Sequence, residues 1–263
     1  MSTALRIDQH DRVMTLTLDR PERKNPLTFD LYAQLHQLFV NLSEDTQTRV
    51  VVLRGAGDNF CSGGDVHDII GPLTRASATE QHAFTQLTGD VVKAMRACPQ
   101  PILASVDGVC AGAGAILAMA SDLRFLSIRA NVSFLFVRVG LAGCDMGACA
   151  MLPRIIGFGR AAQLLYTGET LDAQRAHAWG FANALFSPVD LHSEVASMAL
   201  GIASGPTLAH AATKRALHQE AHMAIDDAID LEAKVQAELM MSNDFRIAYE
   251  AFATKHTPVF TGE

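Results

Sequence analysis

Hydrophobic and polar positions along the chain follow two periods, one typical of strands and one typical of helices. The run "ALRIDQHDRVMTLTLDRP" (4–21) contains two alternating stretches around a short turn, which predicts a β-hairpin. Between Thr28 and Ser43 apolar residues recur at helical spacing, so we expect a helix that begins near Thr28 and ends before Ser43. The continuous β-branched run "RVVVLRGAG" (49–57) predicts a strand buried on both faces.

The next segments continue the alternation of helix and strand. The stretch 78–99 has helical spacing and is stopped by Pro99. "PILASVDG" (101–108) predicts a strand that leads into a helix, "VCAGAGAILAMAS" (109–121), and "DLRFLS" (122–127) predicts another strand. Alternating strands and helices indicate an α/β layered core.

The alternation of strands and helices ends after the core, and from Pro206 onward only helical periodicity is found. Apolar residues there form one stripe, with acids and a lysine opposite it: Ala224, Ala228, Leu231, Val235 and Leu239. We therefore divide the chain into a core, residues 1–200, and a helical region, residues 201–263. The stripe predicts that this region packs against the core or against another subunit.

Composition limits the classes of protein that fit. The 263 residues, 49% hydrophobic and 19% charged, suit one large domain or a core with a smaller appendage. Apolar runs are too short to span a membrane, and "MSTALRIDQHDRV" lacks a basic-then-apolar signal pattern, so we expect a cytoplasmic protein. A net charge of −7 without a long basic run argues against a general nucleic-acid binder, but leaves room for a local basic pocket.

Cysteine and histidine spacing favours neither disulfides nor a metal. The five cysteines form no CxxC pair, so they are expected to be reduced and mostly buried: Cys61, Cys98, Cys110, Cys144 and Cys149. His218 and His222 lie one helical turn apart, yet the HExxH order and a third ligand are missing. We therefore predict no metal site.

Two predicted strand-to-helix junctions are rich in glycine: "NFCSGGDVHDI" (59–69) and "GVCAGAGAILAM" (108–119). A helix N-terminus offers unpaired N–H groups, and small residues allow an anion or an oxyanion to come close. Tight turns alone also explain the glycines. The second junction matches a dinucleotide-binding pattern, but it lies past residue 100 and no Tyr-x-x-x-Lys pair exists, so a short-chain dehydrogenase is excluded.

The segment "GLAGCDMGA" (140–148) places a single carboxylate, Asp145, among small apolar residues. An ionised group there loses hydration unless something compensates. One interpretation is a turn or helix N-cap residue, since aspartate favours both positions. The other is a functional carboxylate.

Six segments, in this order, resemble the crotonase (enoyl-CoA hydratase/isomerase) superfamily over nearly the whole chain: "LDRPERKNPL" (18–27), "NFCSGGDV" (59–66), "VDGVCAGAGAILAMASDLRF" (106–125), "VGLAGCDMGACAMLPRIIG" (139–157), "LLYTGETLDAQRAHAWGFAN" (164–183) and "FATKHTPVFTGE" (252–263). The resemblance implies a spiral core of repeated ββα turns, followed by a C-terminal helical trimerisation region. It also implies trimers, often paired into hexamers.

The same resemblance implies a coenzyme A thioester substrate and no further cofactor. Two backbone N–H groups, matched to Gly64 and Ala113, would form an oxyanion hole for the thioester oxygen. Such donors contribute about 2.7–4 kcal/mol each to stabilising an oxyanion. Residues matched to coenzyme A contacts are Arg20, Arg23, Lys24, Ser62 and Lys255, although Arg23 and Lys24 are equally well explained as surface charges.

The chain departs from the hydratases of this superfamily at two positions. Their two catalytic glutamates are matched here by Ile116 and Phe136, which cannot transfer a proton. Asp145 instead matches a functional aspartate of relatives that isomerise dienoyl thioesters, dehalogenate aryl thioesters or isomerise ring epoxides. The apolar neighbours Ile116 and Phe136 would desolvate Asp145 and raise its pKa, whereas a helix beginning at Met146 would lower it.

One carboxylate suffices for a 1,3-proton shift through an enolate, while hydration benefits from a base and an acid together. The sequence therefore favours double-bond isomerisation or hydration of an enoyl-CoA with Asp145 as acid and base. Alternatives are a ring-type isomerase, a dehalogenase or a thioester hydrolase of aromatic catabolism, and a non-catalytic acyl-CoA binder. Ile116, Phe136 and His67 would line the substrate pocket, although His67 also fits a plain polar position beside Asp65, which is expected to cap a helix.

Overall fold

The computed structural model describes residues 4–263, and its core contains two β-sheets. The larger sheet has the strand order β1-β2-β3-β4-β6-β9; only the β1–β2 pair is antiparallel. The smaller has the order β5-β7-β8. The strands are β1 Leu5–His10, β2 Val13–Leu18, β3 Val50–Gly55, β4 Ile102–Val106, β5 Val109–Ala111, β6 Leu123–Ser127, β7 Asn131–Ser133, β8 Thr170–Asp172 and β9 Ala184–Phe186.

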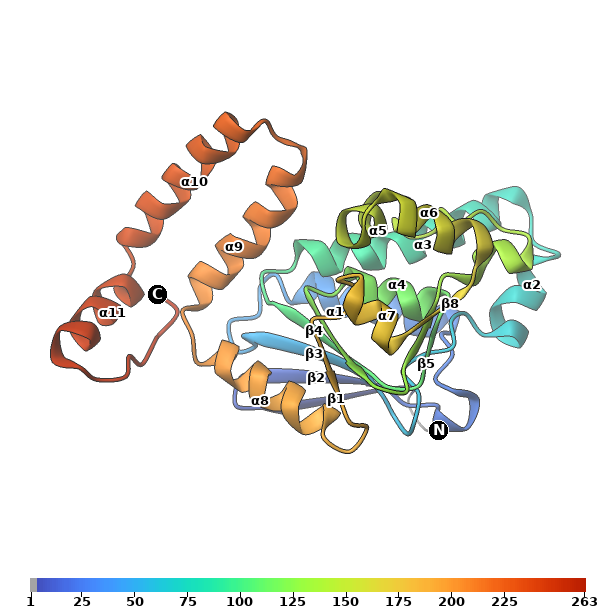
Figure 1. The fold of residues 1–263 in the computed structure, drawn as a ribbon, viewed down its shortest axis with the longest axis horizontal. Coiled ribbons are helices and arrows are strands. Elements are labelled where there is room, and N and C mark those ends of the chain that lie inside the picture. Colours follow the sequence, from blue (N-terminus) through green and yellow to red (C-terminus); the bar gives the residue numbers. More distant parts are fainter. Residues whose placement is uncertain (1–3) are drawn as a thin grey trace.

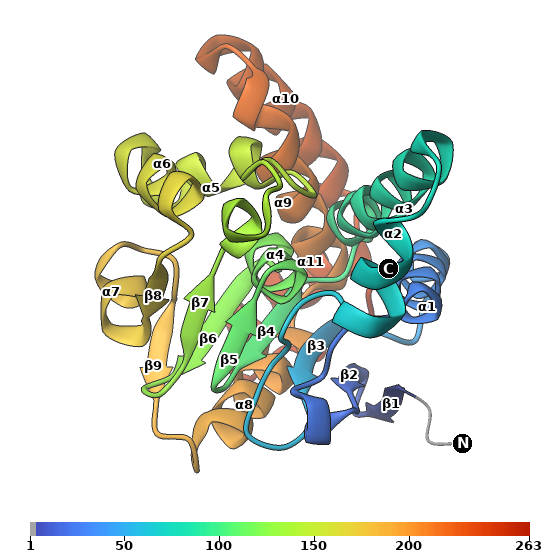
Figure 2. The same ribbon diagram turned by 90° about the vertical axis from the view of Figure 1, so that its right-hand side faces the viewer.

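Helices cover both faces of the larger sheet (Figures 1 and 2). Most of them, with the smaller sheet, lie on one face, whereas α8 lies alone on the other. The helices are α1 Phe29–Asn41, α2 Gly71–Leu73, α3 Ala78–Ala97, α4 Ala113–Ala120, α5 Ala148–Ile156, α6 Phe158–Thr167, α7 Ala173–Ala178, α8 Leu191–Ala203, α9 Thr207–Gln219, α10 Ile225–Met240 and α11 Asn243–Thr254.

Each face of the sheet has its own apolar core. The larger core includes Leu16 and Leu53, which are partners in the β2–β3 register, and the whole of α4 is buried in it. The smaller core joins Val50 and Val52 of β3 to Val195 of α8. Burial on both sides explains why β3 is an unbroken apolar run rather than an alternating one.

The sequence predicts several of these elements correctly. The hairpin is β1–β2, and α1 begins after Thr28, whose side chain accepts a hydrogen bond from the Leu31 N–H. The prediction of one helix over 109–121 is wrong. Residues 109–111 instead form β5, because the Ala111 N–H donates to the Cys61 carbonyl of the first junction. Gly112 has a positive φ of 52°, which a right-handed helix does not accommodate, so α4 begins only at Ala113.

The C-terminal helices α9, α10 and α11 extend away from the α/β body (Figure 1). The buried Lys214 ties α9 to the body, since its ammonium group lies 3.0 Å from the Asp122 carboxylate and donates to two backbone carbonyls. None of the residues of α10 is buried in the described chain. The apolar stripe lies on α10, except for Ala224, which is its N-cap.

No helix within residues 4–263 combines the length and the apolar character needed to cross a membrane.

Candidate active site

The two glycine-rich junctions are brought into direct contact by the fold. Cys61 and Cys110 form a parallel β-bridge, and the Ala111 N–H donates to the Cys61 carbonyl at 2.8 Å. Gly63 has a φ of 100°, and a Cβ there would lie 3.1 Å from the Ala111 carbonyl oxygen. Only glycine combines this backbone conformation with so close an approach.

Gly114 shows why small residues recur in the second junction. A Cβ at this position would lie 2.5 Å from the Cys61 carbonyl oxygen, so any side chain would push the first turn of α4 away from the first junction. A Cβ on Gly63 would likewise lie 3.6 Å from the Ala113 nitrogen. The glycines therefore hold the two loops in van der Waals contact.

Two backbone N–H groups at this contact have no acceptor within residues 4–263. The backbone bonds around Gly64 go from Leu27 to the Gly63 carbonyl and from Asp65 to the Leu27 carbonyl, so the Gly64 N–H is unused. Ala113 is the first residue of α4, and its N–H is also without an acceptor. These are the two donors that the sequence predicts for the oxyanion hole.

Asp145 lies in the loop between a 3₁₀ turn over Leu135–Val139 and α5. Its side chain is half-buried, and burial raises the pKa of its carboxyl group, with a smaller opposite effect from the Met146 N–H. Because the two effects oppose each other, the sequence could not give the direction; in the structure burial dominates.

The alternative that Asp145 caps a helix beginning at Met146 is wrong. Helix α5 begins at Ala148, with Gly147 as its N-cap and no side-chain capping bond. Met146 and Gly147 have φ values of 46° and 90°, which a right-handed helix does not accommodate. Asp145 does begin a turn, as the same interpretation also allows, because its backbone carbonyl accepts the Ala148 N–H at 2.8 Å, but its carboxyl group does not cap α5.

Tyr32 is the neighbour of Asp145 that sequence reasoning missed. Burial raises the pKa of this phenol well above its usual range, and the Asp145 carboxylate raises it further. Its ring stands edge-on to Phe84 at 5.7 Å. The effect on the Tyr32 pKa places Asp145 within electrostatic range of Tyr32. No local signal distinguishes Tyr32 from the other buried positions of α1.

The residues predicted to line the substrate pocket fall into two groups. Ile116 and Phe136 are buried in the same apolar core as Ala113 and Met146, so they form an apolar environment beside the second junction. His67 has an exposed side chain, and its backbone N–H donates to the Asp65 carboxylate. The pocket assignment of these residues stays a prediction.

Asp65 is the centre of a charged cluster beneath the first junction. Its carboxylate is fully buried and lies 3.0 Å from the guanidinium groups of both Arg20 and Arg23. It also accepts the N–H groups of His67 and Asp68, so it caps the helical turn Val66–Ile70, as predicted. Arg23 therefore has a structural partner, in addition to any ligand it binds.

The other residues matched to coenzyme A contacts lie in different parts of the molecule. Lys24 is exposed beside the first junction, where the Ser62 N–H donates to its carbonyl oxygen at 2.9 Å. Lys255 follows α11 as its C-cap. Helix α11 lies at the opposite end of the molecule from α2, which follows the first junction (Figure 1). Within one chain, Lys255 is therefore separated from Lys24 and Ser62.

Three of the five cysteines are buried, and burial affects how readily a thiol ionises. Cys61, Cys98 and Cys110 are buried, while Cys144 and Cys149 are exposed. Burial raises the pKa of the Cys61 thiol to about 12, so this thiol stays protonated at neutral pH. Residues 4–263 contain no group of three or more His, Cys, Asp or Glu side chains arranged to hold a metal ion.

Replacing Asp65 tests the charged cluster. We expect Asp65→Asn to lower the free energy of unfolding by about 3 kcal/mol, because two guanidinium groups lose their buried partner. Burial alone would raise the Asp65 pKa, but the N–H donors and both arginines together hold it below its usual range. The stabilisation is therefore present above pH ~4, and is lost as pH falls through the lowered pKa.

Chemical denaturation of wild type and Asp65→Asn at several pH values measures this difference. The gap between the two should shrink as pH falls from about 4 through the lowered pKa of Asp65, where the folded wild-type carboxylate becomes protonated. Asp68→Asn is the matched control, since the Asp68 side chain is 53% exposed and should change stability by less than ~1 kcal/mol. Equal losses in both variants would contradict the cluster's role.

The chain matches known proteins over nearly its whole length. A family model described as enoyl-CoA hydratase/isomerase matches residues 8–263. The chain belongs to the enoyl-CoA hydratase/isomerase family. It therefore has a crotonase-like α/β fold and is an enzyme of the lyase or isomerase type.

Individual members of the family differ in their named reactions. The chain is 33% identical to 1,2-epoxyphenylacetyl-CoA isomerase of Escherichia coli K12, covering 95% of each chain. It is 29% identical to trans-2-decenoyl-[acyl-carrier-protein] isomerase of Streptococcus mutans, again covering 95% of each. A solved structure from Streptomyces coelicolor A3(2), named as a candidate enoyl-CoA hydratase, superposes with a TM-score of 0.97 at 42% identity, covering 99% of this chain and 95% of that one.

Proposed function

We propose that the protein isomerises or hydrates an enoyl-CoA thioester through an enolate, with Asp145 as acid and base. Two observations support the proposal. Asp145 has a half-buried carboxyl group with a raised pKa, and its neighbour Met146 is buried in the same apolar core as Ala113. The Gly64 and Ala113 N–H groups have no acceptor within residues 4–263. A general base works best when its pKa lies close to the operating pH, and the shift of Asp145 is in that direction.

In the isomerisation, the thioester oxygen accepts hydrogen bonds from the Gly64 and Ala113 N–H groups. For a 3-enoyl thioester, ionised Asp145 removes a proton from the α-carbon, which lies between the carbonyl group and the double bond, and the electron pair moves onto the thioester oxygen. The protonated Asp145 then returns the proton to the other end of the conjugated system. The double bond moves by one position, and no atom is gained or lost.

In the hydration, Asp145 takes a proton from a water molecule whose oxygen bonds to the β-carbon, and the resulting β-hydroxy enolate is held by the same two N–H groups. The α-carbon then receives the proton. Isomerisation is favoured because Ile116 and Phe136 supply no second carboxyl group, and addition of water benefits from separate acid and base groups. Two of the relatives named above are also isomerases.

Substrate binding and assembly complete the proposal. Arg23, Lys24 and Ser62 would contact the coenzyme A nucleotide, and no cofactor other than the substrate's own coenzyme A is needed. Lys255 would reach a nucleotide only in another subunit. This fits a trimer or a pair of trimers, in which the helical region, residues 201–263, joins the subunits and the spiral core, residues 1–200, carries the acyl-CoA site. Residues 1–3 lie outside the described structure. We place the enzyme in the cytoplasm, without nucleic-acid or membrane partners.

A panel of enoyl-CoA and aryl-CoA thioesters tests the reaction. We expect unchanged mass with a shifted ultraviolet spectrum for a 3-enoyl-CoA, which signals isomerisation. A gain of the mass of water would indicate hydration, and free coenzyme A would indicate hydrolysis. If every thioester binds and none is converted, the protein is an acyl-CoA binder and the proposal fails.

A further inference from the structure

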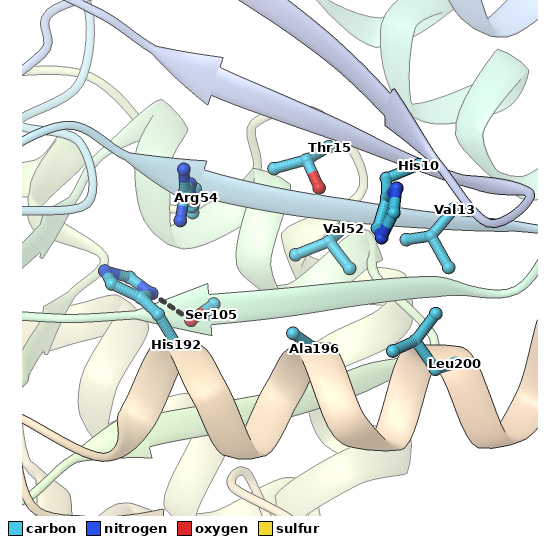
Figure 3. A pocket seen from close by; sticks show the side chains of 9 residues that line it. All are labelled: His10, Val13, Thr15, Val52, Arg54, Ser105, His192, Ala196 and Leu200. Atoms are coloured by element: carbon cyan, nitrogen blue, oxygen red, sulfur yellow. Dashed lines mark hydrogen bonds between the residues drawn. The ribbon is translucent and has the colours of Figure 1, made fainter.

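A second cavity lies outside the candidate active site, between α8 and the uncovered face of the larger sheet. It has a volume of about 110 Å³. Residues from β1 to β4 form one wall and α8 forms the other (Figure 3). Roughly 10–15 Å³ suffices for one water molecule, so this cavity has room for a ligand of several heavy atoms.

One end of the cavity is polar. Arg54 of β3 and His192 of α8 lie at this end on opposite walls (Figure 3), and Ser105 of β4 lies 2.8 Å from the His192 Nδ1. The Arg54 Nε donates to the Thr17 hydroxyl at 3.1 Å, but its two terminal nitrogens have no acceptor among the described residues. When Ser105 donates to Nδ1, the His192 Nε2 carries the ring proton and is a second available donor.

The rest of the cavity is mainly apolar, apart from His10 and Thr15 on the sheet side. Val13 and Val52 of the sheet face Ala196 and Leu200 of α8 (Figure 3). Helix α8 leaves part of this wall accessible, since Leu200 is 40% exposed. A ligand that fits both ends therefore combines a charged head with a short aliphatic tail.

The sign of the head group follows from the charges around it. The Asp107 carboxylate, beyond the end of β4, is paired with Arg129 at 2.6 Å, and the same guanidinium also pairs with the exposed Asp58 at 2.7 Å. On β1, Asp8 is paired with Arg6 at 3.2 Å. Arg54 has no ion-pair partner within residues 4–263, so the polar end carries an uncompensated positive charge. An anion is the complementary head group.

We propose that this cavity binds a short-chain aliphatic carboxylate. Its carboxylate accepts hydrogen bonds from the Arg54 guanidinium and from the His192 Nε2–H, and its alkyl chain lies between Val52 and Leu200. This site is separate from the loops that carry Gly64, Ala113 and Asp145, and it does not depend on the reaction proposed for them.

Nuclear magnetic resonance of the histidine side chains tests the site directly, with His192 assigned from a His192→Gln variant. Titration with butyrate should shift the His192 resonances saturably, with a dissociation constant on the order of 1 mM for so small a ligand. Butylamine, which has the same tail and the opposite charge, should cause no saturable shift. Asp145→Asn protein should bind butyrate as wild type does.

Two arginine variants supply the matched comparison. Arg54→Gln should weaken butyrate binding at least ~10-fold, the loss expected for a charge-assisted contact, while its circular dichroism stays native. Arg75→Gln, at an exposed position remote from the cavity, should leave binding unchanged. Absence of saturation at about 50 mM butyrate, equal binding by Arg54→Gln, or equally tight binding of inorganic phosphate would each overturn the proposal.

Discussion

Asp145→Asn should reduce the turnover number by about 10³-fold, within the range for loss of a general acid–base group. The amide has nearly the same shape as the carboxyl group but cannot take a proton from carbon or from water. Affinity for an unreactive saturated acyl-CoA should stay within about 3-fold of wild type, because the two backbone donors and the nucleotide contacts remain. Steady-state kinetics and calorimetry measure the two quantities.

Asp11→Asn is the matched control for this change. Asp11 has a φ of 45°, a conformation that asparagine also tolerates, and its side chain is 67% exposed. It should leave both turnover and binding unchanged. Wild-type activity should also decline as pH falls through the raised pKa of Asp145, so the acid limb should lie above the ordinary aspartate value of ~3.9. Full activity of Asp145→Asn would remove Asp145 from the mechanism.

Ala113→Pro should reduce the turnover number by roughly 10²–10³-fold, the loss measured when one oxyanion donor is removed. Proline deletes the N–H of residue 113 and nothing else that is hydrogen-bonded, since this N–H has no acceptor within residues 4–263. The first position of a helix tolerates proline, because its fixed φ suits the helix and the missing donor is unpaired there in any case. The fold should therefore survive.

Ala113→Ser separates the lost donor from a change of side chain. It adds an oxygen at a position that is 5% exposed but keeps the N–H, so it should retain most of the activity. Thermal unfolding of both variants checks that α4 is intact. If Ala113→Pro folds and turns over at the wild-type rate, the Ala113 N–H does not bind the developing oxyanion.

Elements with local signals were predictable from the sequence. The Thr28 cap and the apolar spacing after it define α1, and the unbroken run at 50–53 defines the buried strand β3. Failures arose where long-range contacts decide the structure. Strand β5 forms because residues 109–111 pair with Cys61 and with β7, and neither partner is near in sequence.

The candidate site shows the same division. The family resemblance predicted Gly64 and Ala113 as the two donors. Both N–H groups lack an acceptor within residues 4–263, and their role as an oxyanion hole stays a prediction. The effect of Asp145 on Tyr32 could not be predicted, because it depends on the packing of two segments that are far apart in the sequence. The separation of Lys255 from Lys24 likewise depends on the direction in which the C-terminal helices leave the body (Figure 1).

A crystal structure with a bound unreactive acyl-CoA tests the central claim most directly. The thioester oxygen should lie about 2.7–3.1 Å from both the Gly64 and the Ala113 nitrogens, the range expected for oxyanion donors. An Asp145 carboxylate oxygen should lie roughly 3–3.5 Å from a carbon of the acyl chain that exchanges its proton. A thioester bound away from these two nitrogens, or an Asp145 side chain turned out of the acyl pocket, would contradict the account.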